Sequence, residues 1–542
     1  MTKSIFLLAD GTGNAAASPF KTNVWRLYQA IDQTGANQIA FYNDGVGTET
    51  FKPLRALGGA FGIGLARDVK DLYQFLCRNY NAAARDRIFL FGFSRGAFTA
   101  RILEGLILRC GIVKAPNDSL LTEYVEHAYS EYKRDAARRA TATRWNIFGL
   151  WLRFLDWIQR RWLGRQIPVA GRHLQFPNIG IQIYPDIDFI GVWDTVDAYG
   201  MPIDGLKIAI DKWFCPMTLA DRNLPDDVQC ACHALSLDDE RPTFRPVLWT
   251  EPALWPERLT QVWFAGVHVN VGGGYPDDGL AYVALQWIMR EAQLVGARFL
   301  PDHVTGVDTR VDAHGHQYDS RAGLAGYYRY RPRNVDDLCN DPKHGVSVPM
   351  PLVHRAAYER ITVRQAACAP TSFPTTYCLA DYLPGALALQ VIAPTEMGIP
   401  NRDSDMDLAR NVIWRRRVAY FATVFSSAIL ALLPIFDWIR GCSFWQGAGA
   451  SISWLLSILS RSWEPVRTAD QWLATLRSAL RWAVEQQFLP RWTVHWLTSF
   501  ANHPTLFLLS AALLLWLFLQ ESQRLQTEIF RRAENAWRHS PP

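Results

Sequence analysis

The sequence predicts an α/β protein in which helices cover a mainly parallel β-sheet. Five short apolar runs have the composition of buried parallel strands: residues 5–9, 38–43, 87–92, 186–193 and 261–267. Between the second and third runs, the apolar side chains of residues 65–80 recur at helical spacing. Alternation of strands with helices is typical of a parallel sheet with helices on its faces.

Length and composition exclude several classes of protein. The 542 residues suffice for more than one domain, and a hydrophobic content of 49% excludes a chain that is disordered throughout. The net charge of +5 is small for this length, so nucleic-acid binding is not indicated. The first residues, "MTKSIFLLADGTG", have too short an apolar stretch for a signal peptide. We therefore expect synthesis in the cytoplasm without a signal peptide.

The third strand leads into "GFSRGA" (92–97), a Gly-x-Ser-x-Gly turn followed by a helix. A strand–turn–helix of this kind is what a nucleophile elbow needs, since it exposes the serine hydroxyl at the edge of the sheet. Ser94 is therefore the candidate nucleophile. The alternative is that Ser94 only caps the helix that follows it.

An acid and a base follow two later strands. The run at 186–193 ends at Asp194, and the run at 261–267 ends at His268. Both side chains would lie at the sheet edge that carries Ser94, where His268 would accept the serine proton and Asp194 would orient the imidazole. Alternatives remain for both roles. They are His233, in a segment that reads as a helix or its end, and Asp188 and Asp197 on either side of Asp194.

A second donor for an oxyanion is expected in the loop after the first strand. "ADGTGN" (9–14) has two glycines that let the backbone approach a ligand, so Gly11 and Thr12 are candidates together with the backbone N–H of Arg95. The alternative is that Asp10 and Asn14 only form an Asx turn in this loop.

Residues 133–172 form a basic insertion with ten Lys and Arg against two Asp. Its centre, "IFGLWLRFLDWIQRRWLGR" at 147–165, places Trp151, Phe154 and Ile158 on one helical face. Such a helix either packs on the main domain as a cap or lies in a membrane interface.

The chain changes character near residue 415. Residues 418–436 are an uncharged run of 19 residues, and residues 492–520 carry no Asp, Glu, Lys or Arg. Runs of this length predict two transmembrane segments, with the uncharged stretch at 442–460 interfacial or re-entrant. Buried core helices are the alternative.

Six segments together resemble one known family: "DGTGN" (10–14), "GVGT" (45–48), "GFSRGA" (92–97), "GVWDTV" (191–196), "HALSLDDE" (233–240) and "VWFAGVHVNVGGGY" (262–275). They are similar to the α/β-hydrolase domain family that includes phospholipase effectors of the bacterial type VI secretion system. The family's nucleophile, acid and base match Ser94, Asp194 and His268. One departure is Asn270, where this pattern leads us to expect an acidic residue.

The resemblance implies an α/β-hydrolase fold and hydrolysis of membrane phospholipid esters through an acyl-enzyme. It implies no metal or organic cofactor. Expected partners are the phospholipid substrate, the bilayer and an immunity or secretion adaptor protein, for an effector delivered by the secretion system. Two other functions stay open, namely a soluble-substrate carboxylesterase with a membrane anchor and a non-catalytic membrane-inserting toxin.

The expected organisation has three parts. Residues 1–132 and 173–400 form the catalytic α/β-hydrolase domain, residues 133–172 form the cap or interfacial insertion, and residues 401–542 form a membrane-associating helical module.

Overall fold

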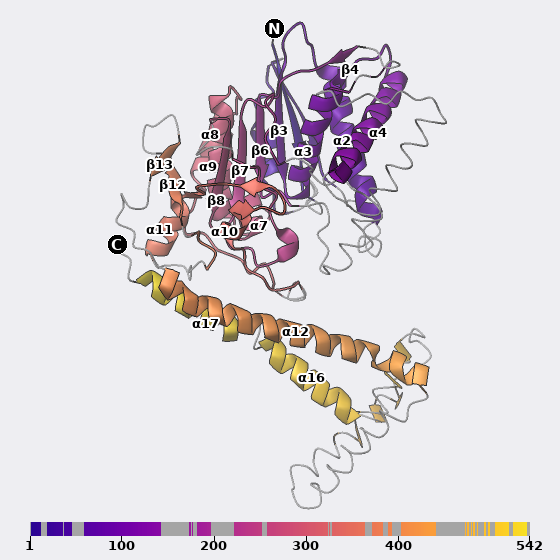
Figure 1. Cartoon of the computed structure of the whole chain (residues 1–542), viewed down its shortest axis with the longest axis vertical. Coiled ribbons are helices and arrows are strands. Elements are labelled where there is room, and N and C mark those ends of the chain that lie inside the picture. Colours follow the sequence, from indigo (N-terminus) through magenta and orange to yellow (C-terminus); the bar gives the residue numbers. More distant parts are fainter. Residues whose placement is uncertain are drawn as a thin grey trace, which may run out of the picture. The chain divides into compact units, whose positions relative to one another are not determined.

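The computed structural model describes most of the chain, in two compact units, residues 1–406 with 533–542 and residues 407–532 (Figure 1). The described ranges are 2–11, 19–45 without 36, 59–142, 173–196 without 175 and 177–180, 222–251, 257–363 without 323–324 and 326–327, 371–382 without 375, 389–392, 403–440, scattered positions between 472 and 498, 504–519 and 524–538.

Nine strands of the first unit form its central sheet within these ranges. In chain order they are β1 (Ser4–Ala9), β2 (Gln38–Asn43), β3 (Arg87–Phe93), β6 (Phe189–Trp193), β7 (Ala231–Ser236), β8 (Leu259–Phe264), β11 (Leu352–His354), β12 (Cys378–Asp381) and β13 (Gln390–Ile392). Their order across the sheet is β13-β12-β11-β8-β7-β6-β3-β1-β2. All neighbours are parallel except β12 and β13, which are antiparallel.

The strand order reverses at β1. From β1 the chain first adds β2 on one side and then β3 on the other, in registers that pair Ala9 with Asn43 and with Gly92. Parallel α/β sheets bind ligands outside the carboxyl ends of the strands at such a reversal. The turn after β3 lies at this point, which places Ser94 at the position where a ligand crevice is expected.

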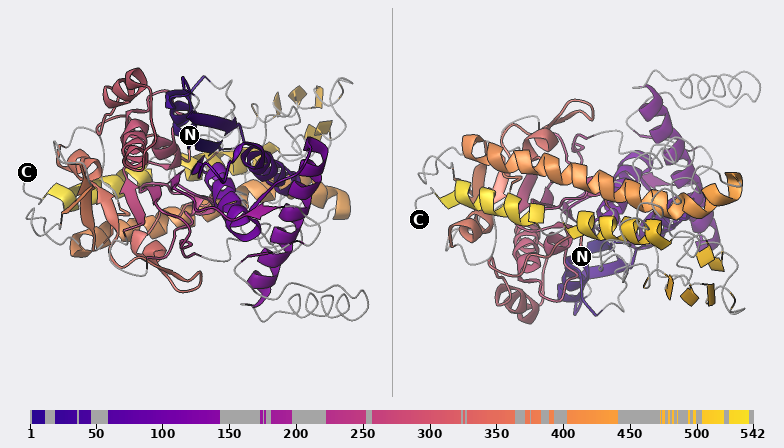
Figure 2. Two further views of the ribbon diagram at one scale, coloured as in Figure 1. Left: turned by 90° about the horizontal axis from the view of Figure 1, so that it is seen from above. Right: turned by 90° about the horizontal axis from the view of Figure 1, so that it is seen from below.

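Helices cover both faces of the sheet (Figures 1 and 2). Alternate residues of β1 point to opposite faces. Ile5 and Leu7 pack in one core with α2 (Gly59–Asn79), α3 (Arg95–Cys110) and α4 (Asp118–Ala142). Phe6 and Leu8 pack in the other core with α1 (Asn23–Ala30), α8 (Gly279–Leu294) and α9 (Pro301–Asp308). A parallel sheet buried on both faces needs strands without polar alternation, and the fully buried "SIFLLA" of β1 meets that requirement.

The remaining short elements of the first unit are β4 (Ile112–Val113), β5 (Gln182–Ile183), the 3₁₀ turn Pro242–Phe244, α7 (His268–Gly272), α10 (Val335–Cys339), β9 (Asn340–Asp341), β10 (Val346–Ser347) and α11 (Arg355–Val363). The pairs β4–β5 and β9–β10 are antiparallel.

The mainly parallel sheet predicted from the sequence is confirmed, and all five expected strands contribute to it. Three outer strands, β11 to β13, were not expected. The segment around His233 was interpreted as a helix or its end, and this is wrong, because it forms the fully buried strand β7. Residues 133–142 of the expected insertion continue α4, and residues 143–172 lie outside the described residues.

The second unit contains most of α12 (Asp403–Arg440), all of α16 (Pro504–Leu519) and the first part of α17 (Leu525–Arg538). Figure 2 shows α17 alongside α12, where Arg415 pairs with Glu528 and Arg416 donates a hydrogen bond to Gln526.

The two expected transmembrane segments are not supported. In the ranges described, no helix combines the length and the apolar character needed to cross a bilayer. The 16 residues of α16 extend about 24 Å, which is shorter than the roughly 30 Å of a hydrocarbon core. Side chains of α12 are described only for residues 409–428, and the stretch 442–460 lies outside the described residues.

Candidate active site

The turn after β3 holds Ser94 in a strained backbone conformation. Its φ of 60° and ψ of −120° are unusual for a residue with a side chain. The flanking glycines make the turn possible. A Cβ on Gly92 would lie 2.5 Å from the carbonyl oxygen of Gly96, and a Cβ on Gly96 would lie 2.1 Å from that of Ala9. Ser94 makes no side-chain capping hydrogen bond to α3, so it is not a simple helix cap.

The fold brings Ser94, His268 and Asp194 together although they are far apart in sequence. Nε2 of His268 lies 2.7 Å from Oγ of Ser94, and Nδ1 of the same ring lies 2.6 Å from Oδ2 of Asp194. All three side chains are buried. An imidazole placed between a hydroxyl and a carboxylate can accept the hydroxyl proton while the carboxylate fixes its tautomer.

Asp194 is held by the ends of β6 and β7. Its φ of 39° is again a left-handed value, and its N–H donates to the carbonyl oxygen of Ala234 at 2.7 Å. The N–H of Ser236 donates to Oδ1 of Asp194 at 3.0 Å, and Oγ of Ser236 lies 3.1 Å from Oδ2. These bonds aim the carboxylate along the sheet edge toward His268.

His268 begins α7, directly after β8. Its N–H donates to Oδ2 of Asp239 at 3.2 Å, and its ring lies between Phe93 and Phe244, with centroids 4.7 and 5.0 Å away. Asn270 stabilises the turn that carries this histidine. Its Oδ1 accepts from the N–H groups of Val267 and Tyr318, and its Nδ2 donates to the carbonyl of His316. An amide can both donate and accept here, which a carboxylate cannot do.

Burial and charge set the protonation of the pair. Burial lowers the pKa of His268 below its ordinary value, against the opposing effect of Asp194. Burial would raise the pKa of Asp194, but the guanidinium of Arg333 and the hydrogen bond from His268 outweigh it and hold that pKa well below its usual range. At neutral pH the site therefore contains a neutral imidazole and a carboxylate, the states needed for a general base and its orienting group.

Sequence reasoning missed Arg333. Its Nη1 lies 2.8 Å from Oδ1 of Asp194, and its Nη2 lies 2.8 Å from Oδ2. It stands in "RYRPRN" (329–334), where three arginines alternate, and no local signal distinguishes the one that reaches the site.

The candidate oxyanion donors have different outcomes. Gly11 donates its N–H to Oδ1 of its neighbour Asp10 at 2.6 Å, and Asn14, the other residue of the alternative Asx turn, lies outside the described residues. Oδ2 of Asp10 also accepts from Thr22 and Tyr42, and burial raises the pKa of Asp10 to about 7. Thr12 lies outside the described residues. Arg95 is the first residue of α3, the position expected for the donor that follows the nucleophile.

The alternative acid and base residues occupy other places. His233 is fully buried in β7, and its Nε2 accepts the N–H of Thr195 at 3.1 Å. Asp188 accepts from Nε of Arg87 and from the N–H of Ile88 at the opposite end of β6. Asp197 lies outside the described residues. In the part of the chain that the structure describes, no group of three His, Cys, Asp or Glu side chains is arranged to hold a metal ion.

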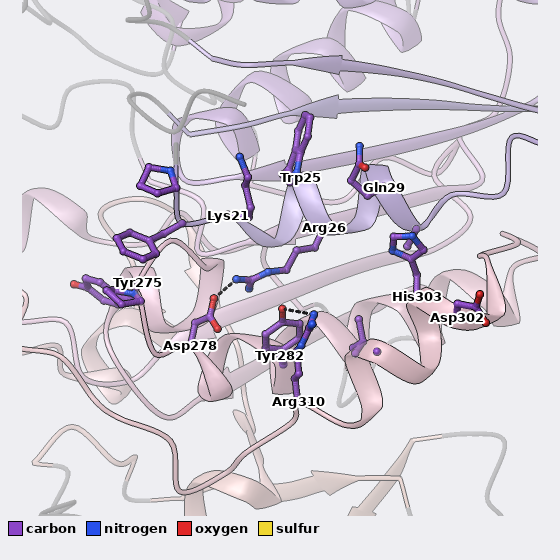
Figure 3. Close-up of a pocket in the computed structure, with 16 residues that line it drawn as sticks. Lys21, Trp25, Arg26, Gln29, Tyr275, Asp278, Tyr282, Asp302, His303 and Arg310 are labelled. Carbon is purple, nitrogen blue, oxygen red and sulfur yellow. Dashed lines mark hydrogen bonds and ion pairs between the residues drawn. The ribbon is translucent and has the colours of Figure 1, made fainter. Parts of the chain in front are cut away.

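A groove of about 540 Å³ lies between α1, α9 and the segment after α7. Figure 3 shows Arg26 on α1 pointing toward Asp278, with which it forms an ion pair, while Tyr282 and Arg310 lie below it. The guanidinium of Arg310 donates to the hydroxyl of Tyr282 at 3.3 Å. Aromatic walls and basic groups from both sides of the groove therefore face the same space. None of the three triad side chains lines it.

A serine on the turn after a central parallel strand, with an aspartate and a histidine after later strands, is the side-chain arrangement of an α/β serine hydrolase. The sequence matches the family described as "T6SS, Phospholipase effector Tle1-like, catalytic domain" over residues 3–291. This match spans more than half of the chain, and the chain belongs to this family.

Two individual proteins are also similar to this chain. An uncharacterized protein of Saccharomyces cerevisiae is 33% identical over an alignment of 147 residues, and the match covers 24% of this chain and 20% of that protein. The chain thus spans about a fifth of the length of this curated relative. The solved structure of the Tle1 effector bound to the VgrG spike from the type 6 secretion system is 13% identical, with a TM-score of 0.34, over 60% of this chain and 78% of that one.

Proposed function

We propose that this chain is a serine hydrolase that cleaves acyl esters of membrane phospholipids. The observation that carries the proposal is the continuous contact from Ser94 Oγ through the His268 ring to Asp194, with separations of 2.7 and 2.6 Å. Membership of a family named for phospholipase effectors supports the lipid substrate.

In the first step, Oγ of Ser94 attacks the ester carbonyl as its proton passes to Nε2 of His268. The carbonyl oxygen becomes an oxyanion, which the backbone N–H of Arg95 at the start of α3 would stabilise. The tetrahedral intermediate then collapses. The ester C–O bond breaks, and the imidazolium gives its proton to the departing alcohol oxygen, which leaves Ser94 acylated.

In the second step, water replaces the alcohol. The water oxygen attacks the acyl carbon while His268 accepts a proton from that water. His268 then gives this proton to Oγ of Ser94 as the fatty acid leaves. Asp194 stays ionised throughout and stabilises the imidazolium. The balance is one ester bond and one water consumed, with one alcohol and one carboxylic acid formed.

The groove beside Tyr275 has the chemistry for a phospholipid head group. Thr22 connects the groove to the elements around the triad. It donates a hydrogen bond to Asp10 after β1 and forms a β-bridge to Gly273, which directly follows the helix α7 that begins at His268. In the groove, Arg310 would bind the phosphate, and the aromatic rings would pack against the glycerol and the upper acyl chains. In the described part of the chain, Arg310 makes no ion pair with a carboxylate, so its charge can meet that of a ligand.

An Arg310→Gln substitution tests this role. The apparent KM for anionic phospholipid vesicles should rise about three- to tenfold, since a charged hydrogen bond is lost. Hydrolysis of a short neutral ester should not change. Arg298→Gln, at an exposed arginine that does not line the groove, is the matched control. Equal losses on both substrates would contradict a head-group site.

We propose that the second unit binds the surface of a bilayer without spanning it. Trp414, Val418, Phe421 and Phe425 recur at intervals of four, three and four residues, and their exposed fractions are 49–68%. Arg415 lies within the same stretch of α12 and is 58% exposed. Exposed aromatic groups beside a basic side chain favour an interfacial position.

The Tle1 effector whose structure was solved is bound to a VgrG spike. We propose that this chain is likewise carried by a secretion spike, and that the cell producing it keeps an immunity protein against it. Co-purification of the full chain with the spike protein encoded in the same genome would test the first part.

The decisive experiment labels the wild-type chain with a fluorophosphonate and maps the adduct, which should lie on Ser94. Purified chain should then release fatty acid from phospholipid vesicles, measured by mass spectrometry, and Ser94→Ala should abolish the release. Activity only on water-soluble esters would favour a carboxylesterase with an anchor. Dye leakage from vesicles that survives Ser94→Ala would favour a membrane-inserting toxin.

A further inference from the structure

Arg333 forms the closest contact of the Asp194 carboxylate apart from His268. Its two terminal nitrogens each lie 2.8 Å from a different oxygen of Asp194, the geometry of a bidentate pair. With Ser236 and His268, five donor groups surround one carboxylate that has no solvent exposure. A carboxylate held at both oxygens cannot rotate away from the imidazole.

Arg333 is itself held in place. Nη1 also donates to the carbonyl and hydroxyl oxygens of Ser236, and Nη2 donates to the carbonyl of Phe244 at 2.6 Å. The next residue, Asn334, caps α10, whose Val335 and Leu338 are buried. The guanidinium is thus fixed from β7, from the turn that carries Phe244 and from the start of α10. Arg333 also lies beyond residues 3–291, the range of the family match.

The charges around His268 form two balanced pairs. Asp194 faces Nδ1 of the ring and is paired with Arg333, and Asp239 accepts the backbone N–H of His268 and is paired with Arg241 at 2.7 Å. Three other titratable or charged groups of the surrounding elements have partners of their own: Asp238 accepts the N–H of Gly266, His233 accepts the N–H of Thr195, and Arg101 on α3 donates to the carbonyl of Val247. The carboxylates nearest the imidazole therefore do not add a net negative charge.

We propose that Arg333 is a positioning residue of the hydrolysis reaction, which holds the Asp194 carboxylate against His268 and offsets its charge so that the imidazole stays an uncharged base in mild acid. This inference rests on the proposed function. A carboxylate alone would stabilise the imidazolium and keep the resting base protonated at higher pH. The lowered pKa of His268, which has burial as its main cause, agrees with this direction.

The test compares kcat/KM on a short soluble ester across pH for the wild type, Arg333→Met and Arg333→Lys. Removing the guanidinium should lower kcat about 100-fold through loss of alignment, with KM within threefold. It should also move the acid limb of the profile up by about one pH unit, because a positive charge near His268 is lost. Arg333→Lys keeps the charge but not the fork, so it should retain the wild-type acid limb and recover only part of kcat.

The matched control is Arg360→Met. Arg360 is equally buried, but its guanidinium donates to the carbonyl oxygens of Ala313 and Gly315 and does not contact the triad. Its loss should lower the melting temperature without moving the acid limb. A purely structural role for Arg333 would give the same result as this control, and that outcome would overturn the proposal.

If Arg333→Met does not fold, Arg333→Lys and an NMR titration of the His268 ring in the folded wild type decide the question. The wild-type ring should titrate below the ordinary histidine value, and a ring that titrates above it would contradict the proposal. Failure of the wild type to react with a fluorophosphonate at Ser94 would contradict the proposed function, whereas a comparison of the His268 titration between the wild type and each folded Arg333 variant would still report on Arg333.

Discussion

Two histidines, one within β7 and one shortly after the neighbouring β8, are both buried and differ in their partners. His233 in β7 and His268 after β8 are both almost inaccessible to solvent, and burial lowers the pKa of each, to about 3 for His233. His233 contacts the Thr195 N–H and Gln261, whereas His268 contacts a serine hydroxyl and a carboxylate. Neither burial nor a shifted pKa identifies a catalytic histidine. A hydroxyl on one nitrogen and a carboxylate on the other do.

The comparison also assigns His233 a part in the site. The backbone N–H that it accepts belongs to Thr195, which follows Asp194 in the left-handed turn. Gln261 connects His233 to Trp249 and Glu251. His233 thus supports the turn that carries Asp194, while His268 lies where the proposed proton transfer needs a base.

The largest expected effect is the difference in kcat between a substitution of His268 and a substitution of His233. His268→Ala should lower kcat on a soluble ester by about four to six orders of magnitude, since loss of a triad base costs almost as much as loss of the whole triad. His233→Gln retains an acceptor for the Thr195 N–H and should stay within about tenfold of the wild type. Initial rates at saturating substrate, with circular dichroism as the folding control, measure both. The reverse ranking would make His233 the base.

A second substitution tests the support that His233 gives. His233→Phe fills the space but leaves the Thr195 N–H without an acceptor in a buried position, which should cost about 1–3 kcal/mol of unfolding free energy. His233→Gln should restore most of that loss. Urea unfolding of both variants measures it. Equal stability of the Phe and Gln variants would show that the Thr195 hydrogen bond contributes little.

The smallest expected effect is a change in how stability depends on pH. Burial lowers the pKa of His233 in the folded chain to about 3, whereas an unfolded histidine has a pKa near 6.5. As pH falls, the unfolded chain therefore takes up this proton before the folded chain does. The contribution of neutral His233 to the free energy of unfolding is therefore complete above about pH 6.5, and it declines by about 1.4 kcal/mol per pH unit as pH falls toward 3. Asp10, with a pKa raised to about 7, acts in the opposite direction. Both chains contain Asp10, so the difference between wild type and His233→Gln isolates His233.

Unfolding free energies at pH 7, 6 and 5 give this difference. The advantage of the wild type over His233→Gln should shrink as pH falls. A constant difference would show that folding does not lower the pKa of the His233 ring.

The sequence predicted the parts of the site that local signals encode. Ser94 follows an apolar strand and stands between two glycines whose Cβ atoms would collide with backbone. Asp194 and His268 each come directly after an apolar run, so the parallel sheet places them at one edge. Strand β7 was misread because "ACHALS" has neither alternation nor strong β-propensity, and its conformation is set by pairing with β6 and β8.

Arg333 shows why the rest of the site could not be predicted. Arg329, Arg331 and Arg333 alternate in one polar segment, and only the packed fold determines which guanidinium reaches Asp194. Gly11 illustrates the opposite case. The glycines in its sequence make it a candidate donor to an oxyanion, and in the structure its N–H is donated to the adjacent Asp10 carboxylate, a partner that the glycine pattern does not indicate.

The distances in sequence between the triad partners bear on when activity can arise during synthesis. Ser94 and His268 are 174 residues apart, His268 and Asp194 are 74 apart, and Arg333 is 139 from Asp194. Contacts between such distant segments form late in folding, because closing a long loop costs entropy before the contact stabilises the chain. The turn of Ser94 also needs β1 already paired, since Gly96 packs on the carbonyl of Ala9. On the ribosome, the proposed nucleophile Ser94 therefore lacks His268 and Arg333 until the segment after residue 333 has emerged, so we expect the proposed activity only once the catalytic unit is complete.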